Sequence, residues 1–174
     1  MTLKGRFAGR VAKSVSITAM NEAIGDAAAA RQRRSSRELM IGLGTNVLVR
    51  YLAQDDPRQS ASATRFIETR LSERSPGFIS LVVLVELCSV LVRVNSATHQ
   101  GIGETVADLL ETPRFHLQER EVVQEAVRRF QDKKSSKTGL ADLVIAQLAL
   151  HAGCSATVSF DPAAVRAAGM TLLD

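Results

Sequence analysis

The chain has 174 residues, 45% of them hydrophobic, which is enough apolar material for one folded domain with a modest appendage. No apolar run reaches the length of about 20 residues that a membrane span needs, and the first 39 residues lack the apolar core of a signal peptide. Cys88 lies in an apolar run and Cys154 follows a predicted helix end, so both should be buried thiols without a disulfide. We therefore expect a cytoplasmic protein.

Positive charge is concentrated in residues 1–39, which hold eight basic and three acidic side chains. Since the net charge of the whole chain is +4, residues 40–174 are close to neutral, and the charge says little about what they bind. We expect residues 1–39 to be a basic extension, flexible or helical, because alanine and arginine favour a helix over residues 17–34. Two interpretations stay open: a mis-assigned start or added leader, or a segment that docks on the domain or on nucleic acid.

From Met40 onward the chain alternates between short apolar strands and helices. Residues 40–43 predict a buried strand, followed by a turn and a helix that Asn46 can cap. Pro57 favours the start of a second helix, over residues 57–71. The inward-facing residues predicted for these two helices are Val47, Leu48, Tyr51, Leu52, Ala61, Phe66, Ile67 and Leu71.

Capping residues and periodicity predict the remaining elements. In order, they are a strand at 77–80, a helix at 81–94 capped by Ser80, a helix at 99–110, a strand at 115–117, a helix at 120–132, a polar loop at 133–139, an apolar helix at 140–151, a strand at 157–160, a helix from Pro162 and a strand at 170–172. Short, mainly parallel strands with helices on both faces make a three-layer α/β domain over residues 40–174.

Two carboxylates stand alone in apolar helical segments. Glu86 is the only charged residue in residues 81–92, which should be buried on nearly all sides, so it needs either an arginine partner such as Arg50 or Arg93, or a metal ion. Asp142 is the only charge in the first turns of its helix, where the helix dipole alone could account for it. Two such carboxylates together favour a functional role.

Asp161 and Asn46 each follow a predicted strand. Asp161 precedes Pro162, so capping the next helix would explain it fully, and Asn46 could likewise be only a cap. Turns that follow neighbouring parallel strands open on the same edge of a sheet, and acids on helices can lean over that edge. We therefore expect Glu86, Asp142 and Asp161 to meet in one pocket.

Five segments together resemble the PIN-domain ribonucleases, most closely the VapC-type toxins of bacterial toxin–antitoxin modules. They are LGTNVLVRYL at 43–52, the Glu86 helix, ADLVIA at 141–146, VSFD at 158–161 and AGMTLL at 168–173. The resemblance implies a metal-dependent endoribonuclease in which Glu86, Asp142 and Asp161 match acids that bind Mg²⁺ or Mn²⁺, and Asn46 matches the asparagine of an Asp-Thr-Asn signature. It also implies RNA as substrate, with tRNA a candidate, a VapB-like antitoxin as partner and a homodimer.

Gly44 departs from the family, because it stands before Thr45 and Asn46 where the signature has its aspartate. Hard cations are held mainly by carboxylates, and even an outer-shell partner is worth about 10–100-fold in metal affinity or activity. We therefore expect strongly impaired catalysis. The phosphate contacts that we predict are Arg50, Lys133, Lys134 and Lys137, for which a solvated loop is the alternative explanation.

Two functions remain open on the sequence alone. One is an endoribonuclease toxin with impaired activity, and the other is a catalytically inactive PIN-like module that binds RNA or antitoxin. A third possibility is a structural α/β domain that binds no metal. The histidines, His99, His116 and His151, have no paired ligand spacing, which disfavours zinc.

Overall fold

The structure is a computed structural model that describes residues 4, 6, 40–132 and 139–173. In chain order, the elements are β1 (Ile41–Gly42), α2 (Thr45–Ala53), α3 (Pro57–Arg70), β2 (Gly77–Ile79), α4 (Leu81–Asn95), α5 (His99–Glu111), β3 (Phe115–Leu117), α6 (Arg120–Gln131), α7 (Leu140–His151), β4 (Val158–Ser159), α8 (Pro162–Ala168) and β5 (Thr171–Leu172). Helices alternate with short parallel strands, so the predicted α/β fold is confirmed.

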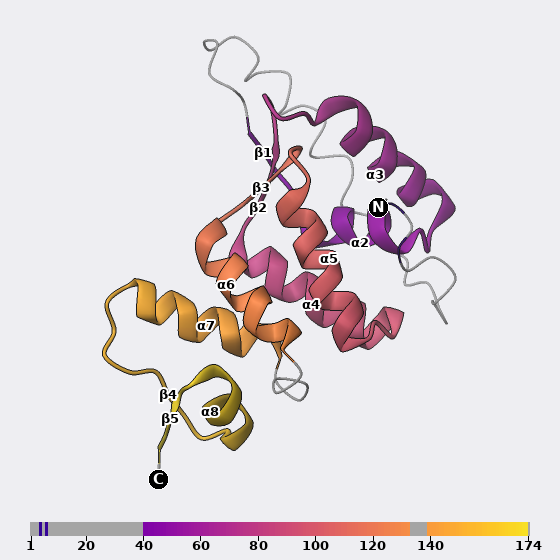
Figure 1. The fold of residues 1–174 in the computed structure, drawn as a ribbon. Coiled ribbons are helices and arrows are strands. Elements are labelled where there is room, and N and C mark those ends of the chain that lie inside the picture. Colours follow the sequence, from indigo (N-terminus) through magenta and orange to yellow (C-terminus); the bar gives the residue numbers. More distant parts are fainter. Residues whose placement is uncertain (1–3, 5, 7–39, 133–138, 174) are drawn as a thin grey trace.

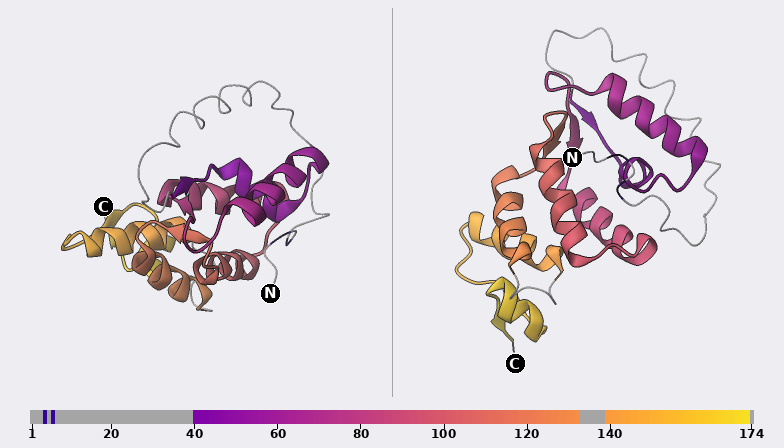
Figure 2. Two further views of the ribbon diagram at one scale, coloured as in Figure 1. Left: turned by 90° about the horizontal axis from the view of Figure 1, so that it is seen from above. Right: turned by 45° about the vertical axis from the view of Figure 1, so that its right-hand side comes forward.

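The first sheet has the strand order β1-β2-β3, with all strands parallel. Ile41 pairs with Gly77, and the N–H of Leu43 still donates to the carbonyl of Phe78, so the pairing extends to the residue before Gly44. Figures 1 and 2 show α2 and α3 at one side of this sheet and α6 and α7 at the other, with α4 and α5 between them. The hydrogen bond between Leu43 and Phe78 attaches the chain just before the turn to the central strand β2.

The last two strands form a second sheet, in which β4 pairs with β5 in parallel through the short crossover helix α8. This differs from the single sheet that the sequence predicted. In Figure 1 and in the right-hand view of Figure 2, β4, β5 and α8 lie beyond α7, at the opposite end of the molecule from β1. Each of these strands has two residues, so it offers few backbone hydrogen bonds. Both strands contact α8, which packs on α7, so α8 joins this sheet to the rest of the domain.

Helix caps explain where most helices begin. The Ser80 side chain accepts from Val83 N at 3.3 Å, as predicted, and Asp56 caps α3 ahead of Pro57. The cap predicted at Asn46 is wrong, because α2 begins at Thr45 with Gly44 in the capping position and no side-chain cap. Ala61 was also predicted wrongly to face inward. It is exposed, because the buried stripe of α3 runs one position away, through Ser60, Ala63, Thr64 and Ile67.

The cysteines differ from each other in exposure, and both are free thiols. Cys88 is buried in α4 as predicted, and burial raises the pKa of its thiol to about 12. Cys154 is exposed, so the prediction of a buried thiol is wrong there. It follows the end of α7, where the chain runs over the surface. No helix among the described residues is long and apolar enough to cross a bilayer.

Gly77, in the central strand of the first sheet, has no room for a side chain. A Cβ atom added there would lie 2.6 Å from Leu43 Cδ1 and 2.8 Å from Leu71 Cδ1. Both leucines are buried, so they have little room to move away. Only glycine therefore lets β1 and the end of α3 close over the central strand.

We expect Gly77→Ala to destabilise the protein by about 1–3 kcal/mol, because the new methyl group overpacks this contact. Gly42→Ala is the matched control, since a Cβ there meets nothing within 4 Å. Urea unfolding followed by circular dichroism gives both free energies of unfolding. Equal stability of the two variants would contradict this account of the packing.

Candidate active site

The turn after β1 brings a hydroxyl group to a carboxylate. Gly44 is in an extended conformation (φ −84°, ψ 157°), and its carbonyl accepts from Val47 N at 3.1 Å, which starts α2. Thr45, the first residue of that helix, donates its side-chain hydroxyl to the carboxylate of Glu86 on α4. Since α2 packs directly on α4, this hydrogen bond fixes the acid beside the end of the sheet.

Glu86 is exposed, so the prediction that its helix is buried on nearly all sides is wrong. Helix α4 buries one face, with Leu84, Leu87, Cys88 and Leu91, and leaves Val82 78% exposed on the other. The two arginine partners considered for Glu86 have other contacts. Arg50 pairs with Asp55, and Arg93 donates to the backbone carbonyl of Ser89.

Asp142 lies in the first turn of α7 and is partly buried. Burial and the nearby charge of Asp161 raise the pKa of Asp142, and a hydrogen bond with the backbone of Gly139 opposes this shift. That hydrogen bond joins the third helical residue to the capping residue, as in a capping box. Asp142 therefore stabilises its helix and also lies within electrostatic reach of a second acid.

Asp161 caps α8, as predicted. Its side chain accepts from Ala163 N at 2.8 Å, Pro162 is the first helical residue, and its own N–H donates to Ser159 Oγ at 3.0 Å. The carboxylate is exposed. Its cap position after β4 holds it near enough to Asp142 for its charge to act on that carboxyl group, so two acids that are 19 positions apart in sequence form a like-charged pair.

The three predicted acids thus have two kinds of neighbour. Glu86 accepts a hydrogen bond from Thr45, and Asp142 lies within electrostatic reach of Asp161. In the described part of the chain, no group of three histidine, cysteine or acidic residues is arranged to hold a metal ion. The donors present are carboxylate and hydroxyl oxygens, the type that suits Mg²⁺ and Mn²⁺. The donor chemistry fits such an ion, whereas the described geometry brings two of the three acids together.

Gly44 lies next to Thr45 and has space around it. A Cβ atom added there would meet only Asn46 Oδ1, at 3.4 Å, and the backbone conformation suits any residue. The position where the family signature has an aspartate can therefore accept that side chain without backbone strain.

The sequence did not reveal that Thr45 contacts Glu86, because such a contact depends on how α2 packs on α4.

The predicted phosphate contacts are only partly described. The Arg50 side chain already binds two neighbouring side chains. Its Nη1 pairs with Asp55 Oδ2 at 2.5 Å, and its Nε donates to Gln59 Oε1 at 2.8 Å. An RNA contact by Arg50 stays a prediction that would have to compete with this ion pair. Lys133, Lys134 and Lys137 lie outside the described residues.

A family model for the PIN domain matches residues 43–170. This range is most of the chain and contains α2 to α8 together with all three acids, so the protein belongs to the PIN-domain family. The membership indicates a nuclease-type domain. No curated protein and no solved structure matches the chain.

We expect Asp142→Asn to change how stability depends on pH. The pKa of Asp142 is raised in the folded state, so the folded chain holds this proton more tightly than the unfolded chain. The protonated Asp142 side chain therefore adds to the free energy of unfolding at low pH. The wild-type protein loses this contribution as pH rises from the ordinary aspartate pKa of about 3.9 through the raised pKa of the folded state, whereas the asparagine of the Asp142→Asn variant has no proton to lose. Urea unfolding between pH 3 and pH 7 should show the variant gaining relative to the wild type as pH rises. A constant difference across this range would contradict the expectation.

Proposed function

We propose that this protein is a metal-dependent endoribonuclease of the VapC toxin type, whose activity Gly44 impairs. The observation that carries the proposal is the meeting of Asp142 and Asp161, from α7 and the end of β4, as a like-charged pair. A carboxyl group whose pKa is raised by burial and by a second acid is typical of a functional site. Membership of the PIN-domain family supports the same chemistry.

Glu86, Asp142 and Asp161 would hold Mg²⁺ or Mn²⁺. Such an ion, when held by these residues, would supply an activated water and would stabilise charge on the scissile phosphate of RNA, with tRNA a candidate substrate. Thr45 positions Glu86 through its hydroxyl, and Asn46, in the first turn of α2, lies beside the same turn. Binding a cation to Asp142 and Asp161 would also remove their mutual repulsion.

The proposed partners are a VapB-like antitoxin and a second copy of this chain. Exposed apolar residues support an interaction surface, since α4 leaves Val82 and Val92 exposed, and α7 leaves Ile145 and Leu150 exposed. We propose a cytoplasmic location, where RNA and such an antitoxin would be available.

A second candidate is an inactive PIN-like module that binds RNA or antitoxin. It is favoured by the absence of an acid at Gly44 and by the separation of the acids into two pairs among the described residues. The two candidates differ in whether a single added carboxylate creates activity.

We expect Gly44→Asp to raise Mn²⁺-dependent RNA cleavage at least about 10- to 100-fold over the wild type, the range associated with a lost metal-site partner. Gly44→Asn is the matched control, because it can also cap α2 but adds no charge. Cleavage of tRNA and of a mixed RNA pool is measured on gels. A double variant that carries both Gly44→Asp and Glu86→Gln tests whether the activity also needs the Glu86 carboxylate.

Cleavage by Gly44→Asp that Glu86→Gln abolishes would support the ribonuclease. Equal rates for Gly44→Asp and Gly44→Asn would contradict a role for this position in holding the cation. No cleavage by any variant, with RNA binding retained, would favour the inactive module.

A further inference from the structure

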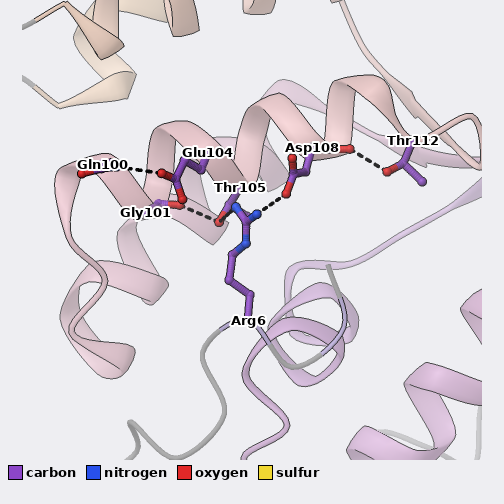
Figure 3. Close-up of polar contacts among 7 residues, drawn as sticks. All are labelled: Arg6, Gln100, Gly101, Glu104, Thr105, Asp108 and Thr112. Carbon is purple, nitrogen blue, oxygen red and sulfur yellow. Dashed lines mark hydrogen bonds and ion pairs between the residues drawn. The ribbon is translucent and has the colours of Figure 1, made fainter. Parts of the chain in front are cut away.

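Arg6 lies against α5, far from its position in sequence. Its Nη1 donates to Thr105 Oγ1 at 3.2 Å, and its Nη2 forms an ion pair with the carboxylate of Asp108. Figure 3 shows the arginine side chain reaching the helix, with its guanidinium group between these two side chains. The Arg6 side chain is only 10% exposed, which is unusual for an arginine outside the folded core.

The surface that receives Arg6 is part of a regular helix. Thr105 is 1% exposed, and its hydroxyl also donates to the carbonyl of Gly101 at 2.6 Å, so the oxygen is fixed with a lone pair left for Arg6. Asp108 lies one turn further along the same face. Helix α5 contains no lysine or arginine, so no basic residue of the helix itself competes for this carboxylate.

A guanidinium group suits this pair of acceptors better than an ammonium group does. Its planar fork can reach a hydroxyl oxygen and a carboxylate at the same time, whereas a lysine offers one compact charge. Lys4, two residues before Arg6, is exposed. Of the two residues that the structure describes in the basic N-terminal segment, Arg6 is therefore the one that contacts this face.

We infer that the Thr105–Asp108 face of α5 is an arginine-binding surface that anchors the N-terminal extension of the same chain through Arg6. The extension is then attached to the domain twice, at Arg6 and at Met40, where β1 is about to begin. The entropic cost of closing a loop of 33 residues grows only slowly with its length, so a single buried arginine contact can hold it. Arg6 is accordingly part of the packed surface of α5.

Thermal unfolding of the full chain tests the contact by a double-mutant cycle. Arg6→Ala and Asp108→Asn should each lower Tm by about 3–6 °C, and the double variant should fall no further than either single variant. Arg6→Lys should recover only part of the loss. Lys4→Ala and Glu111→Gln are the matched controls, from the same segment and the same helix, and should leave Tm unchanged. Additive losses, or no loss from Arg6→Ala, would overturn the inference.

Cross-linking tests proximity without relying on stability. In a Cys154→Ser background that keeps Arg6 and Asp108, Lys4→Cys with Glu111→Cys on α5 should be joined by a short bismaleimide far faster than Lys4→Cys with Arg166→Cys on the distant α8, and adding Arg6→Ala should remove this preference. The buried Cys88 thiol, with its raised pKa, should not compete. An unanchored extension would react without preference between the two positions, and linked dimers would show that the arginine comes from a second chain. Either outcome would overturn the inference.

Discussion

The packing of Leu43 and Leu71 over Gly77 is the constraint on which the candidate site depends. It closes β1 onto the central strand, and two residues after β1 the chain turns at Gly44, which precedes α2. The turn starts α2, and the packing of α2 on α4 brings Thr45 to Glu86. A buried leucine contact thereby determines where a polar site can form at the end of the sheet.

The acids of the site also have structural roles. Asp142 interacts with the backbone at the start of α7, and Asp161 caps α8, so each helix end orients one carboxylate. In the same arrangement, burial and then the nearby charge of Asp161 raise the pKa of Asp142. Structural capping and cation binding are therefore compatible in these residues, and the presence of a cap is no argument against function. Gly44 is different, because it contributes only backbone to its helix.

Much of the fold could be predicted from local chemistry. Ser80 and Pro57 marked helix starts because each favours one helical position through its own geometry. The exposure of Glu86 could not be predicted, because α4 is apolar on nearly every side and its sequence gives no direction for the buried face. The division of the strands into two sheets was also beyond the sequence, since strands of two residues leave their pairing to tertiary packing.

The central claim is that Glu86, Asp142 and Asp161 serve one cation. Paramagnetic broadening by Mn²⁺ in the NMR spectrum of the full chain tests it most directly. At the same substoichiometric Mn²⁺ concentration, the account predicts that the amide signals of Thr45, Asp142 and Asp161 broaden together, and that Glu86→Gln weakens all three effects. Broadening confined to Asp142 and Asp161, unchanged by Glu86→Gln, would contradict a shared site.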